Sequence, residues 1–392
     1  MYFSFTNKQK RIIRIAEEVS ESSLESRAAH YDELAIHPVE SWRDVWESGL
    51  LAMTIPEDYG GIGLDMLTYI MAIEKLAHGC TNTAMTVHMH SVVQRYIDVL
   101  GSPKQKARFY PEVVDEGKLF GSWGSEPGRR GGSGVAKTTI SPVEKGFEIN
   151  GEKHFCTMAG GAYRYMVHCT MSTDSKDEGI LMALVPCGAS GLEITGNWNT
   201  LGMRATVSPS VSFKQCTVDT EEVLGIPGLS EKVGVGQGFG LGYAAVYIGA
   251  AQASLDFLIQ HAKTQRYDPD TSKLSHSLII QRGVAHMMLE LDSARLLMYQ
   301  SAALWEDNTD PITRAVLAAR AKYMASRVAV SVTSAVIQLG GGRVAHRRYP
   351  FERIYRDVRT CTLMPPNDDR SLEIVGKAEL GIDDDLLMLR HS

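Results

Sequence analysis

The sequence lacks several features that mark common classes of protein. Its six cysteines are scattered through 392 residues and form no C-x-x-C pair, so we expect reduced thiols, as in a cytoplasm, and no disulfide framework. Its 12 histidines include no H-E-x-x-H or comparable ligand set, so we expect no metal site. A P-loop and a G-x-G-x-x-G turn after a strand are also missing, which disfavours nucleotide binding on a parallel sheet.

An excess of one charge and long apolar runs are absent too. Forty Lys and Arg face 46 Asp and Glu, a net charge of −6, which excludes a nucleic-acid binder that works by charge. No apolar run approaches the roughly 18 residues of a membrane span, and the first residues hold no apolar signal segment. We therefore expect a cytoplasmic protein with neither a membrane nor a nucleic-acid partner.

Hydrophobic periodicity divides the chain into three parts. Residues 1–119 carry apolar side chains at helical spacing and predict a helical domain. Residues 120–225 contain short runs in which apolar and polar residues alternate, and these runs predict a β domain. Within it, Asn150-Gly151 predicts a hairpin turn. The helical period returns in 226–392. The length suits two or three domains. The order of a helical, a β and a second helical part predicts an α+β fold.

Three long helices and a shorter one are expected in the last part. They cover about 238–265, 278–305 and 311–339, with the short helix after Asp369, and they are long enough to build a bundle. The glycine-rich segment that begins at Gly234 precedes the first of them. We interpret that segment as a hinge or helix start.

A second glycine-rich segment lies at the boundary between the predicted helical domain and the predicted β domain. Trp123-Gly-Ser-Glu-Pro-Gly exposes backbone N–H groups that can hold a pyrophosphate or the polar edge of a flavin. A plain turn between domains explains the same composition. Composition alone leaves both interpretations open.

Several motifs together resemble the acyl-CoA dehydrogenase family of flavoproteins along nearly the whole chain. Pro56-Glu-Asp-Tyr-Gly-Gly is similar to the family's P-E-x-Y-G-G, and Ser125-Glu-Pro-Gly to its T-E-P-G. Ile149-Asn-Gly-Glu-Lys-His-Phe-Cys-Thr resembles N-G-x-K-x-(W/F)-I-(T/S). Leu201-Gly-Met-Arg and Val223-Leu-Gly follow in family order. Gln338-Leu-Gly-Gly-Gly and then Tyr349-Pro-Phe-Glu-Arg-Ile-Tyr-Arg-Asp resemble the C-terminal signature.

The resemblance implies a helical N-terminal domain, a β domain and a C-terminal four-helix bundle, with FAD at their junction and a homotetramer or homodimer. It also implies a set of flavin contacts by position. The isoalloxazine would be bound by Ser122, Gly124, Ser125, Phe155 and Thr157, the pyrophosphate of a neighbouring subunit by Arg266, and the adenosine side by Gln338, Gly341 and Gly342. An arginine suits a pyrophosphate because its fork meets phosphate oxygens bidentately.

The chain departs from the family at the catalytic base. The family reaction needs a carboxylate that removes an α-proton while hydride leaves the β-carbon. One family position for it corresponds to Pro365, and the other falls near Phe239 and Gly240. None of these residues is acidic, so both usual bases are missing.

Asp368 and His90 are the replacements that the sequence offers. A loop shift would present Asp368, or its neighbour Asp369, although capping of the next helix is the favoured explanation of both. His90 and His88 lie on a helix that borders the acyl pocket in the family, and two residues apart they point to nearly opposite faces. We prefer His90 to His88 as the acid/base, and a structural histidine is the equally supported alternative.

Substrate contacts are assigned to Ser133, Arg129 and Tyr243. Arg129, or its neighbour Arg130, would meet a CoA phosphate, with exposure to solvent as the alternative. Tyr243 lies on the 238–265 helix, where core packing also explains it.

Three functions follow from these patterns. The first is FAD-dependent α,β-dehydrogenation of an acyl-CoA thioester, within fatty acid metabolism, with electrons passed to an electron-transfer flavoprotein. The second is a flavin-dependent monooxygenase on the same fold, in which O2 meets reduced flavin and a histidine handles the proton. The third is a flavin- or CoA-binding subunit without turnover.

Overall fold

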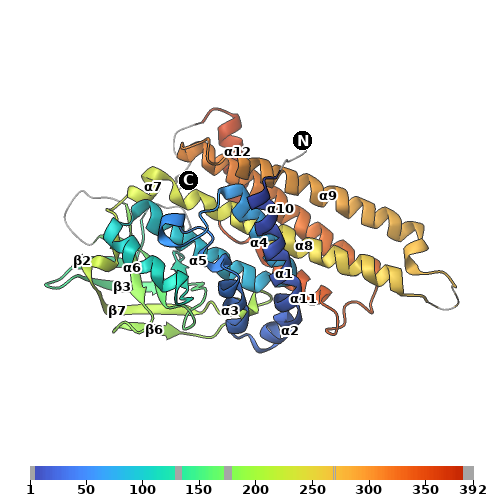
Figure 1. Ribbon diagram of the computed structural model, residues 1–392, viewed down its shortest axis with the longest axis horizontal. Coiled ribbons are helices and arrows are strands. Elements are labelled where there is room, and N and C mark those ends of the chain that lie inside the picture. Colours follow the sequence, from blue (N-terminus) through green and yellow to red (C-terminus); the bar gives the residue numbers. More distant parts are fainter. Residues whose placement is uncertain (1–4, 129–134, 172–178, 268, 270, 383–392) are drawn as a thin grey trace.

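The computed structural model describes residues 5–128, 135–171, 179–267, 269 and 271–382. Figure 1 shows strands gathered at one side of the molecule and long helices extending to the other. The expected boundaries at 119/120 and 225/226 fall at the change from helices to strands and back. Arg129, Arg130 and Ser133, which were expected to contact the substrate, lie outside the described residues.

Six α-helices form the N-terminal part. They are α1 (Asn7–Val19), α2 (Glu25–Leu34), α3 (Val39–Glu47), α4 (Met66–Gly79), α5 (Thr81–Leu100) and α6 (Pro103–Val114). Capping boxes start α1 and α6, with Thr6 and Ser102 as the N-cap residues, and satisfy N–H groups that have no partner inside the helix. α5 is buried on every side from Thr81 to Gln94, so it forms the centre of the molecule.

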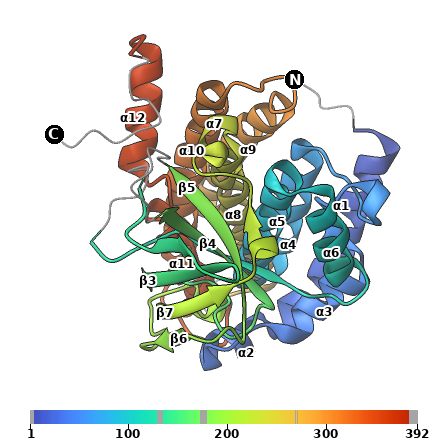
Figure 2. The ribbon, with the colours of Figure 1, turned by 90° about the vertical axis from the view of Figure 1, so that its left-hand side faces the viewer.

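Among the described residues in the middle of the chain, eight strands form one sheet. They are β1 (Phe120–Trp123), β2 (Thr139–Pro142), β3 (Phe147–Lys153), β4 (Arg164–Met171), β5 (Ile180–Pro186), β6 (Leu192–Thr195), β7 (Ser210–Val218) and β8 (Val223–Leu224). The order is β6-β7-β3-β2-β4-β5-β8, and β1 pairs with β4 in parallel. Figure 2 shows this sheet beneath the helices.

The hairpin expected at Asn150-Gly151 was wrong, because β3 runs straight through both residues. Gly151 follows a bulge in the pairing of β3 with β7, at φ +144°. A Cβ on Gly151 would lie 2.7 Å from Thr138 Cα, so the glycine allows two backbones to approach closely. Asn150 Oδ1 accepts the N–H of Gln215 across the sheet instead of capping a turn.

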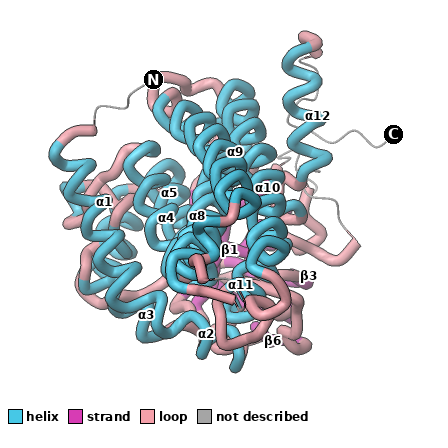
Figure 3. The backbone as a smooth tube through the Cα atoms, turned by 90° about the vertical axis from the view of Figure 1, so that its right-hand side faces the viewer, coloured by secondary structure: helices cyan, strands magenta, loops and turns pink. Residues whose placement is uncertain are grey.

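The C-terminal part consists of helices. They are α7 (Leu229–Val233), α8 (Phe239–Thr264), α9 (Leu278–Ala303), α10 (Pro311–Gly340), α11 (Phe351–Arg359) and α12 (Asp368–Glu379). Figure 3 shows α8, α9 and α10 side by side, with α12 along α10. α7 and a 3-10 turn lead into α8, so the segment at Gly234 is a helix start, as expected.

Buried ion pairs join the parts. Arg164 on β4 binds Glu112 of α6 and Glu222, and Arg295 of α9 binds Glu74 of α4. The six cysteines are free, and all but Cys187 are buried. None of the helices in the described part of the chain has the length and apolar character to cross a membrane.

Candidate functional site

The glycine-rich segment after β1 is held against the end of β3. The carbonyl of Ser125 accepts the N–H of His154 at 2.9 Å, and the indole N–H of Trp123 donates to the carbonyl of Thr157 at 3.0 Å. These bonds fix the segment 122–125 beside the segment 154–157. The structure thereby brings together all five residues that the resemblance placed around a flavin ring: Ser122, Gly124, Ser125, Phe155 and Thr157.

Phe155 and Thr157 present groups that a flat, polar ligand would use. Phe155 stands at φ +55° and remains 65% exposed, which is unusual for a large apolar ring. Thr157 Oγ1 accepts a hydrogen bond from Ser208 at 3.1 Å, which leaves its own proton available to donate. The exposed ring offers a face for stacking, and the hydroxyl offers a donor beside it.

A buried ion pair supports this arrangement from beneath. Lys153 Nζ lies 2.6 Å from Glu126 Oε1 with both side chains fully buried, and Nζ also donates to the carbonyl of His168. Glu126 accepts the N–H groups of Lys137 and Thr138 as well. Burial alone would raise the pKa of Glu126, but the ammonium and the N–H groups hold it at about 2. The glycine-rich segment is therefore tied to β2 and β3.

A second group of predicted residues lies beyond the far end of α8. Arg266, Gly341 and Gly342 line an open pocket of about 410 Å³ together with Tyr267, Gly340 and Arg343. The Arg343 guanidinium stands 4.6 Å from the centre of the Tyr267 ring. Gln338 is exposed on the last turn of α10 and is not part of the lining. Two arginines and a run of glycines suit an anionic ligand such as a pyrophosphate.

The two groups lie at opposite ends of α8. Phe239, at its first turn, packs near Tyr96, whose ring lies 6.1 Å from that of His168, which in turn lies against Gly124. Arg266 follows the other end of the 26-residue helix, about 39 Å away at 1.5 Å per residue. The two groups of predicted residues are therefore separated by the full length of α8 within one chain.

The two histidines of α5 have different surroundings. His90 Nδ1 accepts the N–H of Phe120 at 2.9 Å, and its Nε2 faces the carbonyl of Leu51 at 3.2 Å. His88 Nδ1 bonds the Tyr69 hydroxyl at 2.7 Å, while its Nε2 makes no hydrogen bond of normal length within the described residues and the ring interacts with the backbone of Phe239. Burial lowers the pKa of both imidazoles to about 3. The structure therefore favours a structural role for His90, against our preference, and His88 is the less fully bonded of the two.

Neither expected position holds a base. Pro365 is exposed and joined to Pro366 by a cis peptide bond, and Gly240 packs against Ala318 of α10. Phe239 contributes a ring to a buried aromatic group. Asp368 begins α12, where its Oδ1 lies 3.6 Å from the buried ammonium of Lys322 and makes no hydrogen bond. Its carboxylate is the acidic group nearest in sequence to the missing base.

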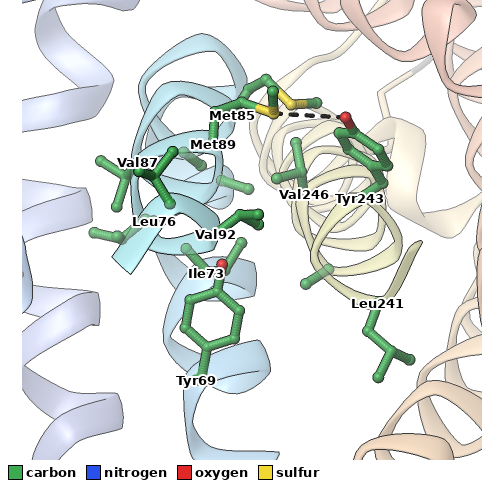
Figure 4. Close-up of a cluster of buried hydrophobic side chains, with 14 of the residues drawn as sticks. Tyr69, Ile73, Leu76, Met85, Val87, Met89, Val92, Leu241, Tyr243 and Val246 are labelled. Atoms are coloured by element: carbon green, nitrogen blue, oxygen red, sulfur yellow. Dashed lines mark hydrogen bonds between the residues drawn. The ribbon is translucent and has the colours of Figure 1, made fainter. Parts of the chain in front are cut away.

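Tyr243 belongs to the core, which was the alternative to its assignment as a substrate contact. It is 5% exposed, and its hydroxyl donates to Met89 Sδ at 3.5 Å, as Figure 4 shows. Val246 of α8 lies on the side that faces Val92 and Met85 of α5 in the same cluster. Across the described ranges, no three His, Cys, Asp or Glu side chains are grouped to hold a metal ion.

Comparison with known proteins gives one consistent family. Models of the acyl-CoA dehydrogenase N-terminal, middle and C-terminal domains match residues 6–117, 121–216 and 241–380. The short-chain specific mitochondrial acyl-CoA dehydrogenase of Rattus norvegicus is 32% identical over 347 residues, covering 87% of this chain and 82% of its own length.

Solved structures of two kinds share the fold. Butyryl-CoA dehydrogenase from Megasphaera elsdenii is 26% identical, with a TM-score of 0.88 over 97% of this chain and 100% of its own. TdsC from Paenibacillus sp. A11-2, solved with FMN and indole, is 28% identical, with a TM-score of 0.86 over 95% of this chain and 97% of its own. The expected α+β, three-part architecture is confirmed. The chain belongs to the acyl-CoA dehydrogenase family and is an oxidoreductase of that type.

Proposed function

We propose that this protein oxidises an acyl-CoA thioester between its α- and β-carbons, with FAD as cofactor. The observation that carries the proposal is the fixed pair of segments 122–125 and 154–157, with an exposed aromatic ring, in a chain of this family. Two hydrogens leave the substrate, and a carbon–carbon double bond forms.

FAD is the cofactor of this family, and the described residues fit it. The exposed ring of Phe155 and the free proton of Thr157 suit the flavin ring, and the pocket of Arg266 suits the pyrophosphate. When bound, the flavin accepts a hydride from the substrate. Because the two groups of residues lie at opposite ends of α8, we propose that the pocket of one chain serves the cofactor of a second, in a homodimer or homotetramer.

The protein's own task is to position the thioester and remove one proton. The loop after β1 is held rigid by Glu126 and Lys153, so its backbone N–H groups are oriented before a ligand arrives. We propose Asp368 as the base, since its Oδ1 makes no hydrogen bond. The Lys322 ammonium, 3.6 Å from this Oδ1, orients the carboxylate as a positioning residue.

A flavin-dependent monooxygenase is the second candidate. One observation favours it: Pro365, Phe239 and Gly240 provide no carboxylate where the family places its base. The likeness to TdsC, solved with FMN, shows that this fold accommodates such a ligand. A histidine would then handle the proton, and His88 is the less fully bonded of the two on α5.

Anaerobic titration of the FAD-loaded protein with acyl-CoA thioesters tests the proposal. Dehydrogenation predicts that the flavin absorbance bleaches with at least one thioester, and that Asp368→Asn slows bleaching at least 100-fold without weakening thioester binding. An unchanged rate in that variant would exclude Asp368 as the base. A flavin that no thioester bleaches, with O2 uptake when reduced flavin is supplied, would favour the monooxygenase. If neither reaction is observed, the third hypothesis remains, a flavin- or CoA-binding subunit without turnover.

The proposal also covers the electron acceptor, the metabolic role and the cellular location of the enzyme. We propose that an electron-transfer flavoprotein takes the electrons, as expected of the family, and that the reaction belongs to fatty acid metabolism in the cytoplasm. The described surface contains no metal site and no membrane-spanning helix that would require another arrangement.

A further inference from the structure

A partly buried arginine on the second half of α5, Arg95, has two nitrogens without a hydrogen-bond acceptor. Arg95 Nε and Nη2 are closed off from solvent and have no hydrogen-bond partner among the described residues. A guanidinium has five N–H donors, and burying it unpaired opposes folding. A side chain that the fold leaves in this state is explained by a ligand that pairs with it.

The acidic groups around Arg95 are all engaged elsewhere. Glu306, Asp98 and Asp65 face the guanidinium from three elements and act on it only at longer range than an ion pair. Glu306 accepts the N–H of Met66, Asp65 caps α4 by accepting from Thr68, and Asp98 pairs with Lys106. None of these carboxylates completes the hydrogen bonding of Arg95.

Tyr69 and His88 lie beside Arg95. The guanidinium carbon stands 4.8 Å from the centre of the Tyr69 ring, and the Tyr69 hydroxyl bonds His88 Nδ1 at 2.7 Å. The His88 imidazole also interacts with the backbone of Phe239. Arg95 is therefore the member of this group whose N–H donors most clearly lack an acceptor.

This group is continuous with the candidate flavin site. The His88 ring meets the edge of Phe239 at 6.1 Å, and Phe239 lies 6.4 Å from Tyr96. Tyr96 contacts His168, which lies against Gly124 in the glycine-rich segment. A wall of rings therefore leads from the flavin segment to Arg95, with Phe239 at one of the positions where the family places its base.

We propose that Arg95, with Tyr69 and His88 beside it, recognises a carboxylate carried by the acyl part of the substrate. The proposal rests on the proposed function, because it assumes that the substrate is an acyl thioester. A carboxylate accepts two parallel hydrogen bonds from one guanidinium. A neutral acyl group would leave the cation unpaired, so the same residue discriminates against it.

Paired thioesters of equal chain length test the proposal. Binding of succinyl-, glutaryl- and adipyl-CoA to the FAD-loaded protein is compared by calorimetry with that of butyryl-, valeryl- and hexanoyl-CoA. At least one carboxylate-bearing member should bind roughly 10- to 100-fold more tightly than its neutral counterpart. Arg95→Met should remove this difference, whereas Arg14→Met, at an exposed arginine paired with Glu18, should retain it. Equal binding in every pair, or a preference that survives in Arg95→Met, would overturn the proposal.

Thermal unfolding without ligand gives a second measurement. Because Arg95→Met removes two buried N–H-bearing nitrogens that lack acceptors, the melting temperature of the variant should equal or exceed that of the wild type. A large fall would show that the arginine serves the core and would overturn the proposal.

The outcomes also separate this proposal from the proposed function. An Arg95-dependent preference without bleaching of the flavin would refute dehydrogenation and retain the subsite. Bleaching by thioesters without any preference for a carboxylate would support dehydrogenation and refute the carboxylate subsite. If no thioester binds, both fail.

Discussion

The pair formed by Lys153 and Glu126 is the interaction on which the flavin segment depends, and its removal should be costly. Lys153→Met takes away a fully buried ammonium 2.6 Å from a fully buried carboxylate. Glu126 also accepts the N–H groups of Lys137 and Thr138. A buried carboxylate that has lost its ammonium partner opposes folding.

The magnitude follows from the pKa of Glu126. Its pKa is lowered from 4.5 to about 2, and at about 1.36 kcal/mol per pKa unit the ionised form gains roughly 3 kcal/mol on folding. Because the folded-state pKa is the lower one, this stabilisation is present above pH 4.5 and is lost as the pH falls towards 2. Lys153 supplies this shift together with the two N–H groups, and removal of one partner of a buried ion pair costs about 3–5 kcal/mol, so we expect Lys153→Met to lower the free energy of unfolding by about 3 kcal/mol at neutral pH.

Urea unfolding followed by tryptophan fluorescence measures this loss, since Trp123 lies in the affected segment. The flavin-to-protein ratio after gel filtration should fall in the same variant. The matched double variant Lys153→Met/Glu126→Leu removes both charges and should recover part of the loss. A decrease below about 0.5 kcal/mol in the single variant, the size of an ordinary surface substitution, would refute the reasoning.

Three further substitutions test other parts of the structure. Arg266→Ala should reduce FAD retention, because a pyrophosphate would lose a charge-assisted partner; an unchanged flavin-to-protein ratio would contradict the assigned pocket. His90→Ala should lower the free energy of unfolding by about 1–3 kcal/mol, since Phe120 and Leu51 lose a buried partner, and should leave turnover per bound flavin unchanged; a 100-fold loss of turnover would restore it as an acid/base. Gly242→Ala would place a Cβ 2.0 Å from the His88 ring and should cost about 1–3 kcal/mol, whereas Gly376→Ala, with open space around it, should not; equal urea midpoints in the two variants would argue against this close approach.

The sequence was sufficient for the long elements because their signals are local. Apolar residues at helical spacing predicted the helix around 238–265, and α8 spans Phe239–Thr264. The Asn150-Gly151 pair failed because the same dipeptide suits a turn and a bulge, and only the pairing of β3 with β7 decides between them. Contacts with a distant strand are not visible in a window of a few residues.

The site was predictable in part for a similar reason. The motifs located Ser125 and Phe155, which the structure brings together. Helical phase could not show which histidine is the less fully bonded, because α5 is buried on all sides over most of its length. The pairing of Lys153 with Glu126 and the unpaired state of Arg95 depend on residues far apart in the chain, and no local pattern indicates either.

The central claim is that this protein removes two hydrogens from the acyl chain of a CoA thioester. The most direct measurement is anaerobic mixing of the FAD-loaded protein with acyl-CoA thioesters, in which the flavin absorbance and the mass of the thioester are followed together. We predict that the flavin band bleaches while an equal amount of thioester loses two hydrogens. A flavin that stays oxidised while the thioesters bind and are recovered unchanged would contradict the account.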